Sequence, residues 1–307
     1  MGQLFDTRMA EWREQIDSCL HTIISETAYP DEFKEILEYA VFPGGKRLRP
    51  ILFLEWHSLY APPNEESLKF ACAFELFHCY TLIHDDMPCM DNDDIRRGKP
   101  TVHKKYGEGK ALLAGDALLD LAYMTMYSAA YAVGKLKNIQ AFMLSGDMGV
   151  IRGQYLDMYG KAEHINNLLG DVYMFKTASL IASACKMGYL FMSDMPEEEY
   201  RAPFIQHIID RLFIPNPDKY KEQRVSLAAG AGLFGILFGV AFQIYDDISE
   251  YVAGEKADSA NVLDFLPLDE AKELLNTYLN DAVAQLNREY NGDTSYLKQL
   301  VEKFIIV

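Results

Sequence analysis

The chain has 307 residues, 50% of them hydrophobic, and a formal net charge of −16 at pH 7. This length and composition allow a large hydrophobic core, in one domain or in two. The negative charge argues against a nucleic-acid partner, because phosphate contacts along a nucleic acid need a basic face, although local basic clusters can still bind small phosphate ligands.

Helical periodicity recurs along the chain, whereas alternating Val/Ile/Thr runs are scarce and no Asn-Gly hairpin turn lies between two such runs. The pattern predicts helices at residues 5–26, 31–40, 46–59, 65–87, 109–132, 137–158, 168–190, 197–211, 219–252, 268–289 and 295–305. Proline and glycine mark the joints, as in Pro43-Gly44-Gly45. The simplest account is one all-α domain over residues 1–307, in which central helices that are apolar on most faces are surrounded by amphipathic ones.

One uncharged segment, residues 225–245, is long enough to span a membrane. It runs directly into Asp246 and Asp247, which lipid would not tolerate unless they faced water. No second segment of this kind occurs, and Gly235 and Gly239 suit close contact between helices. We therefore expect a buried core helix and no transmembrane segment.

The cysteines form no CxxC pair and fall mostly within helical patterns. They are Cys19, Cys72, Cys79, Cys89 and Cys185. This usage predicts reduced thiols rather than a disulfide framework. The first residues, MGQLFDTRMAEWREQ, contain no basic stretch followed by an apolar one, so no secretory signal is visible. A reducing cytoplasm is the expected location.

An acidic cluster follows the apolar helix predicted at 65–87, and it comprises Asp85, Asp86 and Asp91. Pro88 has no N–H to donate to the carbonyl of His84, so it should end the helix and let the chain turn. That turn would bring Asp91 toward Asp85, which ideal helix spacing does not allow.

A second acidic cluster, Asp246, Asp247 and Glu250, follows the uncharged segment. Asp246 and Glu250 are four residues apart and therefore lie one turn apart on one helix face. Carboxylate oxygens without interleaved His or Cys are hard ligands that suit Mg²⁺. A single Asp pair at a helix end more often only contacts solvent. Two triplets, each at the mouth of an apolar helix, predict a magnesium site.

Basic residues accompany both clusters. They are Lys46, Arg47 and Arg49 in PGGKRLRP, Arg96 and Arg97 after the first acidic cluster, and Lys176 beside Thr177 in YMFKTASL. Arginine's planar fork and lysine's point charge both hold phosphate oxygens. Any one of these residues is more often a solvated surface charge. Together with carboxylates for metal and apolar helices beneath, they indicate a site for a phosphate ligand.

At these residues the chain resembles the short-chain trans-prenyl diphosphate synthases, the family of farnesyl and geranylgeranyl diphosphate synthases. The match runs from GGKRLRP through ELFHCYTLIHDDMPCMDNDDIRRGKPTVH, LLAGDALL, RGQYLDM and FKTASLI to AFQIYDD, over roughly residues 30–260. The motifs are long and occur in order. The resemblance implies an all-α fold with the active site in a central bundle, and a homodimer.

The resemblance also implies roles for matching positions. Asp85, Asp86, Asp91, Asp246, Asp247 and Glu250 would be Mg²⁺ ligands, holding three ions together with bound diphosphate. Arg96, Lys176, Thr177, Gln243 and Lys256 would hold the allylic diphosphate. Lys46, Arg49, His78 and Arg97 would hold isopentenyl diphosphate. The catalytic set would be Asp85, Asp86, Asp246, Lys176 and Arg96.

The chain departs from the family pattern at several positions. Glu250 stands where the second motif usually ends in Asp, Asn261 falls about where a lysine is expected, and Arg152 occupies a usual glycine position. Residues 191–223 look longer than the usual connection and suggest an inserted lid or interface. These departures bear on rate and substrate range more than on the class of reaction.

The expected reaction is Mg²⁺-dependent head-to-tail condensation of isopentenyl diphosphate with dimethylallyl or geranyl diphosphate, which releases pyrophosphate. Farnesyl diphosphate is the expected product, because the resemblance places an aromatic floor at Tyr80, although a helical wheel puts Thr81 and Phe77 more directly under Asp85. The alternatives are a geranylgeranyl diphosphate synthase, a class I terpene cyclase, which would not need the second cationic pocket, and a non-catalytic subunit, which should have lost its aspartates.

Overall fold

The computed structural model describes residues 2–42, 44–143, 148–191, 227–254, 260–290 and 293–306. The helix predicted at 197–211, nearly all of the insertion proposed at 191–223, and Lys256 lie outside the described residues. Backbone contacts divide the chain into two compact units. Unit 1 comprises Met1–Leu54 and Pro62–Leu136, and unit 2 comprises Glu55–Ala61 and Lys137–Val307. The single domain over residues 1–307 stays a prediction.

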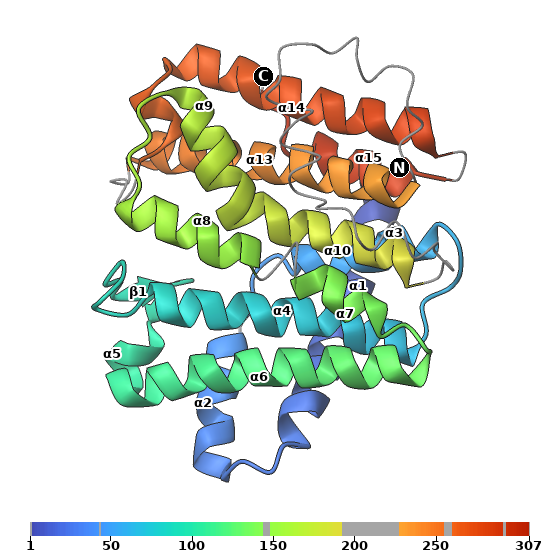
Figure 1. Cartoon of the computed structure of the whole chain (residues 1–307), viewed down its shortest axis with the longest axis vertical. Helices are drawn as coiled ribbons and strands as arrows, with labels where there is room; N and C mark the ends of the chain where they lie inside the picture. Colours follow the sequence, from blue (N-terminus) through green and yellow to red (C-terminus); the bar gives the residue numbers. More distant parts are fainter. Residues whose placement is uncertain are drawn as a thin grey trace. The chain divides into compact units, whose positions relative to one another are not determined.

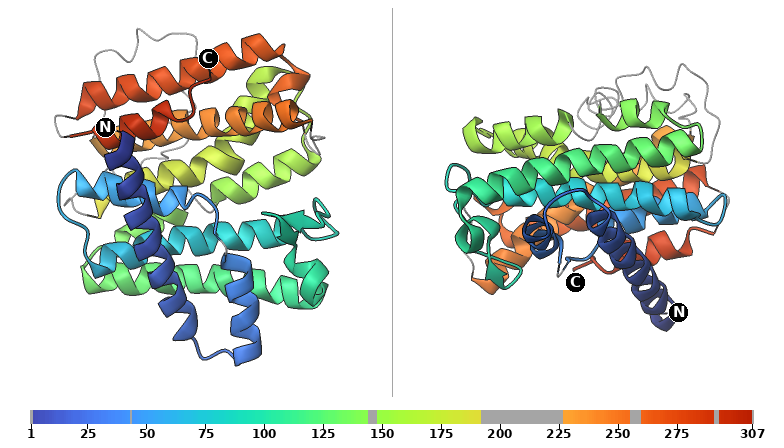
Figure 2. Two further views of the ribbon diagram at one scale, coloured as in Figure 1. Left: turned by 180° about the vertical axis from the view of Figure 1, so that it is seen from behind. Right: turned by 90° about the horizontal axis from the view of Figure 1, so that it is seen from below.

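Unit 1 is built on two long helices that lie side by side (Figure 1). Its elements are α1 (Gly2–Ser25), α2 (Asp31–Val41), the first part of α3 (Leu48–Ser58), α4 (Glu65–Asp85), β1 (Ile95–Arg96), β2 (Lys99–Pro100), α5 (Val102–Tyr106) and α6 (Glu108–Ala132). The α4 and α6 helices form its main packing contact, and α1, in dark blue, runs across α4 (Figure 2). As the sequence predicted for a central helix, α4 buries side chains around most of its circumference.

Unit 2 is also helical. Its elements are the end of α3, α7 (Lys137–Phe142), α8 (Met148–Tyr159), α9 (Ile165–Asn167), η2 (Leu168–Ala178), α10 (Ser179–Leu190), α13 (Leu227–Ala253), η4 (Val262–Asp264), α14 (Leu268–Glu289) and α15 (Ser295–Glu302). The α13 helix packs against α10, α14 and η2 (Figure 1). The rings of Phe238, Phe242 and Tyr245 on α13 all contact Phe304, which follows α15.

Of the described helices, one, α13, is long and apolar enough to cross a membrane by length and composition alone. In its most apolar window 72% is buried within the structure, as expected for a helix in a protein core. A Cβ atom at Gly235 would lie 2.4 Å from the Cα of Ala182, and one at Gly239 would lie 2.5 Å from the Cα of Ala178. The close helix contact predicted from these glycines is therefore confirmed.

The all-α fold is confirmed, and three local features differ from the prediction. The helix predicted at 137–158 is described as two helices, α7 and α8. The stretch predicted as one helix at 168–190 begins with the π-helix η2 before continuing as α10. A short hairpin, β1 and β2, was not predicted. Its turn residues Arg97 and Gly98 both have positive φ, 52° and 75°, so a two-residue turn forms here without Asn-Gly.

Candidate active site

The first acidic cluster lies at the C-terminal end of α4, in unit 1. The helix ends at Asp85, and Asp86 is its C-cap residue. The backbone N–H of Asp91 then donates to the carbonyl of Asp85 over 2.9 Å, and that of Asn92 donates to the carbonyl of Met87 over 3.1 Å. The turn that was predicted to bring Asp91 toward Asp85 is confirmed. Asn92 takes a positive φ of 57° in this turn, a conformation that asparagine tolerates well.

Arg96 binds two carboxylates of its own motif. Its Nε donates to Oδ1 of Asp86 over 2.5 Å, and its Nη2 donates to Oδ2 of Asp93 over 2.9 Å. Burial raises the pKa of Asp86 to about 6, and the guanidinium of Arg96 offsets only part of that effect. Asp86 is therefore a buried carboxylate held by an internal cation, which differs from an open metal ligand.

Several arginines act electrostatically on His78, which lies on α4. Burial, followed by the positive charges of Arg49, Arg97 and Arg96, holds the pKa of His78 well below its usual value. His78 is therefore neutral at physiological pH and can donate one hydrogen bond. Its predicted companions Lys46, Arg49 and Arg97 all belong to unit 1, and the structure brings Arg49 and Arg97 within electrostatic reach of it.

A glycine of α6 positions the end of α4. The ring of His84 lies against Gly115, where a Cβ atom would be only 2.1 Å from Nε2 of the ring. The same nitrogen is 3.2 Å from the carbonyl oxygen of Leu112. Sequence reasoning singled out LLAGDALL as a motif but assigned it no role. Its glycine makes room for the residue that precedes the first aspartate.

The second acidic cluster lies on α13, in unit 2, and its middle member is buried. The hydroxyl of Tyr173 donates to Oδ2 of Asp247, which also accepts from the backbone N–H of Val262 over 2.8 Å. Gln243 Nε2 donates to Oδ1 over 3.1 Å, and Thr177 Oγ1 donates to Gln243 Oε1 over 2.7 Å. Burial raises the pKa of Asp247, although Tyr173 and Val262 lower it in part. The network joins η2, α13 and η4.

Asn261, the residue that departs from the expected lysine, has a structural role. Its side-chain oxygen accepts from the backbone N–H of Leu263 over 2.9 Å, and its own N–H donates to Asp264 over 2.9 Å. This capping box begins η4 and presents the N–H of Val262 to Asp247. Asn261 therefore supports the acidic cluster through the backbone.

Lys176 lies on the π-helix η2 and is paired with a carboxylate of α8. Its Nζ donates to Oδ2 of Asp157 over 2.6 Å. Gly153 allows the approach, because a Cβ atom there would be 2.0 Å from the backbone nitrogen of Lys176. The guanidinium of Arg152, which replaces a usual glycine, lies 4.1 Å from the ring centroid of Phe175. π-helical segments are rare, and they are frequently found at functional sites.

Sequence reasoning missed Tyr173, Asp157 and Gly153 as parts of this half of the site. All three fall in or beside motifs that had been singled out, RGQYLDM and FKTASLI. Motif membership was the only available signal, because a helical pattern cannot show that Tyr173 reaches a residue 74 positions away.

The donor set was tested for its fit to Mg²⁺. Across the parts of the chain that the structure describes, no group of three or more His, Cys, Asp or Glu side chains is arranged to hold a metal ion. The chemistry still fits, because the predicted set offers only hard carboxylate oxygens. Asp86 and Asp247 accept hydrogen bonds from internal donors, and all six carboxylates of the two clusters stay the predicted ligands.

The predicted chain-length residues lie in the core of unit 1. Tyr80 is buried, and its ring meets those of Phe77 and His84 edge-on, with centroids 4.7 Å and 5.7 Å apart. Phe77 is fully buried and also faces Tyr123. These contacts hold the Tyr80 ring rigidly, and its role in product length stays a prediction.

Comparison with known proteins identifies the family. Residues 30–208 match the family model for polyprenyl synthetase. The chain is 30% identical to a farnesyl diphosphate synthase of Bacillus subtilis, with 89% of this chain and 88% of the relative covered. It is 29% identical to a farnesyl diphosphate synthase of Escherichia coli, with 96% and 98% covered. A solved geranyltransferase from Legionella pneumophila superposes with a TM-score of 0.80 at 25% identity, covering 98% of this chain and 96% of that one. The chain therefore belongs to the polyprenyl synthetase family of trans-prenyl diphosphate synthases, and it is a prenyltransferase.

Proposed function

We propose that the protein condenses isopentenyl diphosphate with dimethylallyl diphosphate and then with geranyl diphosphate, giving farnesyl diphosphate and releasing pyrophosphate at each step. The nearly full-length similarity to proteins named farnesyl diphosphate synthase supports this choice. A geranylgeranyl product is the alternative, because a geranylgeranyl pyrophosphate synthase of Arabidopsis thaliana is also 29% identical over 89% of this chain.

The observation that carries the proposal is the cationic cluster around His78. Arg49, Arg97 and Arg96 act electrostatically on this neutral histidine in unit 1. In unit 2, Lys176 pairs with Asp157, and Thr177 donates to Gln243. A condensation needs one cationic site for each of two diphosphates. A terpene cyclase takes one diphosphate and has no use for the second site.

The chain's own residues would act by binding and orienting the two substrates. Lys176 and Arg96 would supply positive charge to the leaving pyrophosphate as it develops negative charge. Holding the two reactants in contact can lower the barrier by roughly 7–11 kcal/mol at best. The double bond of isopentenyl diphosphate then attacks the allylic carbon, and the released pyrophosphate accepts the proton that is lost.

We propose Mg²⁺ as the metal, with three ions held together with bound diphosphate. The residues that would hold it are the six predicted carboxylates, Asp85, Asp86 and Asp91 in unit 1 and Asp246, Asp247 and Glu250 in unit 2. When bound, Mg²⁺ neutralises the charge of the diphosphate leaving group. Arg96 and Tyr173 would orient Asp86 and Asp247 among these ligands by the hydrogen bonds that they donate.

For product length, we propose that Tyr80 closes the cavity at fifteen carbons. Five residues of helix place it about 7.5 Å along the α4 axis from Asp85. Its ring is fixed by Phe77 and His84, so it cannot swing aside easily. Each further methylene of a growing chain gains about 0.8 kcal/mol on burial, so a rigid obstacle is needed to stop elongation.

We propose a homodimer, supported by an apolar stripe on α6. Leu113, Met124, Tyr127 and Tyr131 lie on one face of this helix and are 59%, 67%, 56% and 66% exposed. Large side chains exposed along one face favour a protein partner. A cytoplasmic location is supported by the cysteines, all of which are free.

The test is a two-substrate rate experiment with purified protein and Mg²⁺. Initial rates are measured with geranyl diphosphate alone, isopentenyl diphosphate alone, and both together. We expect pyrophosphate release only with both, and its loss in excess EDTA. Rapid pyrophosphate release from geranyl diphosphate alone, with cyclic or hydrolysed products, would indicate a cyclase instead. No release under any condition would refute the proposed condensation.

A further inference from the structure

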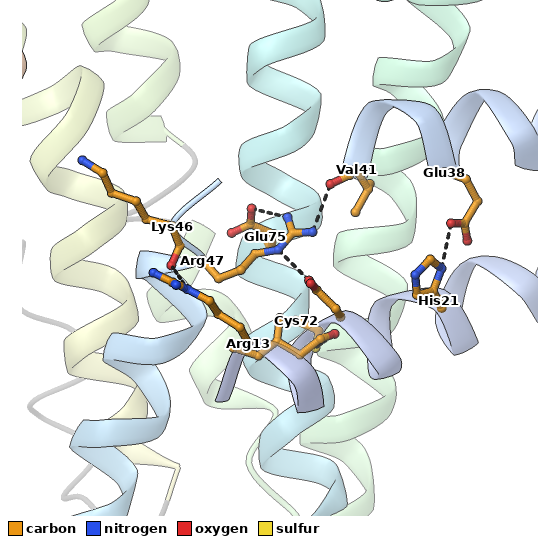
Figure 3. A network of polar contacts seen from close by, with 10 residues as sticks. Arg13, His21, Glu38, Val41, Lys46, Arg47, Cys72 and Glu75 are labelled. Carbon is orange, nitrogen blue, oxygen red and sulfur yellow. Dashed lines mark hydrogen bonds and ion pairs between the residues drawn. The ribbon is translucent and has the colours of Figure 1, made fainter. Parts of the chain in front are cut away.

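Arg47 lies between two predicted ligands of isopentenyl diphosphate in the sequence, Lys46 and Arg49, but its own side chain is buried. It precedes α3 in the motif GGKRLRP, and its side chain is 1% exposed, whereas Lys46 is exposed. Figure 3 shows the Lys46 side chain extending away from the guanidinium of Arg47. Arg47 also has a positive φ of 52°, which is uncommon for a residue other than glycine. A buried charge on a strained backbone needs a structural reason.

All three guanidinium nitrogens of Arg47 have partners on different helices. The Nε atom donates to Oδ1 of Asp17 on α1 over 2.8 Å, and Nη1 donates to Oε1 of Glu75 on α4 over 2.7 Å. The Nη2 atom donates to the carbonyl of Val41, the last residue of α2, over 3.0 Å (Figure 3). Arginine's fork can serve three acceptors at fixed angles, which a lysine ammonium cannot match in the same place.

Arginine side chains occupy the space where Gly44 and Gly45 would carry a Cβ atom. A Cβ atom at Gly44 would lie 1.9 Å from Cζ of Arg47, and one at Gly45 would lie 2.9 Å from Nη2 of Arg97. The backbone of this loop therefore runs close to the buried guanidinium of Arg47. The carbonyl of Lys46 also accepts from Nε of Arg13 over 3.4 Å.

Glu75, the buried partner of Arg47, lies on the same helix as His78. Glu75 is buried, with a side chain 2% exposed, and it precedes His78 on α4 by three residues, about one turn. The ion pair between Arg47 and Glu75 therefore ties the segment that carries Lys46 and, at the start of α3, Arg49 to the turn of α4 that carries His78.

We infer that Arg47 is a positioning residue for the isopentenyl diphosphate site. The ion pair between Arg47 and Glu75 sets the distance from Lys46 and Arg49 to His78. Arg47 itself does not touch the substrate. This inference rests on the proposed function, because it assigns Arg47 to one of the two substrate sites of that reaction.

Two variants test the role without leaving a buried charge unpaired. Arg47→Met/Glu75→Leu replaces the pair by apolar side chains of similar size, which proteins often tolerate without loss of stability. Asp17→Asn weakens one contact at a carboxylate that is 40% exposed, so the fold should be retained. Glu38→Gln is the matched control, because the Glu38 carboxylate pairs with His21 in the same unit and takes part in none of the three hydrogen bonds of Arg47. Folding is checked by thermal melting.

The readout is the KM for each substrate, with the other saturating. In the double variant we expect the isopentenyl diphosphate KM to rise about tenfold, the size expected when a charge-assisted hydrogen bond is misplaced. We expect the geranyl diphosphate KM to stay within about twofold, since a charge-positioning defect is confined to one pocket. Asp17→Asn should raise the same constant by about threefold, and Glu38→Gln should change neither.

An isopentenyl diphosphate KM that is unchanged in both folded variants would overturn the positioning role, and so would an equal rise in both constants. If the double variant fails to fold, Asp17→Asn alone is the test. A selective rise in its isopentenyl diphosphate KM would support the role, and no change or an equal rise in both constants would overturn it. Wild-type protein that releases no pyrophosphate would refute the proposed function itself. An active wild type with unaffected variants would refute only the role of Arg47.

Discussion

The buried carboxylate of Asp86 should make the protein less stable as the pH rises. Burial raises the pKa of Asp86 from 3.8 to about 6, so the folded protein binds this proton more tightly than the unfolded chain. The contribution of Asp86 to stability is therefore complete below about pH 4 and is lost as the pH rises through about 6. Since one pKa unit corresponds to about 1.4 kcal/mol, a shift of about two units costs about 3 kcal/mol at neutral pH.

Replacing Asp86 by Asn removes the charge but keeps an oxygen that can accept from Arg96. We expect Asp86→Asn to raise the free energy of unfolding by about 2–3 kcal/mol at about pH 7.5 and to leave it almost unchanged at about pH 4. The same variant should lose activity, because Asp86 belongs to the predicted catalytic set. Charges at functional sites are commonly kept although they lower stability.

The assay is urea unfolding of metal-free protein in EDTA, followed by circular dichroism at several values between about pH 4 and pH 8. Asp94→Asn is the matched control, because Asp94 lies in the same loop but is exposed and pairs with Lys104 at the surface. A stability difference for Asp86→Asn that does not vary with pH, or that has the opposite sign, would refute the reasoning.

Three further predictions concern single side chains. Tyr173→Phe removes a donor to the buried carboxylate of Asp247, so the free energy of unfolding should fall by about 2 kcal/mol in urea titrations, whereas a loss below about 0.5 kcal/mol would contradict this. Tyr80→Ala should shift products toward twenty carbons or more by chromatography, and an unchanged distribution would make Phe77 the next candidate for the floor. Glu250→Asp should keep or raise the rate of condensation, because it restores the usual ligand of the second motif. A rate loss as large as that of an alanine variant would show that the site requires glutamate.

The helices could be predicted because their apolar periodicity is strong, and the turn at Asp91 could be predicted because Pro88 cannot continue a helix. The division between η2 and α10 could not, since π- and α-helical segments bury similar apolar patterns. The contacts of Tyr173 and Glu75 were also out of reach. In the sequence, both residues resemble ordinary core residues of a helix. Their partners, Asp247 and Arg47, are remote in sequence.

The metal ligands illustrate the same limit. Sequence placed six carboxylates in two clusters, but it could not show which partners from other segments two of them meet. Asp86 and Asp247 each face internal donors from residues elsewhere in their unit. Helical spacing carries no information about such partners, because it describes positions along one element and not what approaches it from another.

The most direct test of the central claim is a product analysis with wild-type protein. Purified protein, Mg²⁺, geranyl diphosphate and labelled isopentenyl diphosphate are incubated, and the dephosphorylated products are resolved by chain length. We predict labelled farnesol as the main product, with one pyrophosphate released for each label incorporated and no incorporation in Asp246→Ala. Incorporation that persists in Asp246→Ala, or the absence of any labelled prenyl product from the wild type, would contradict the account.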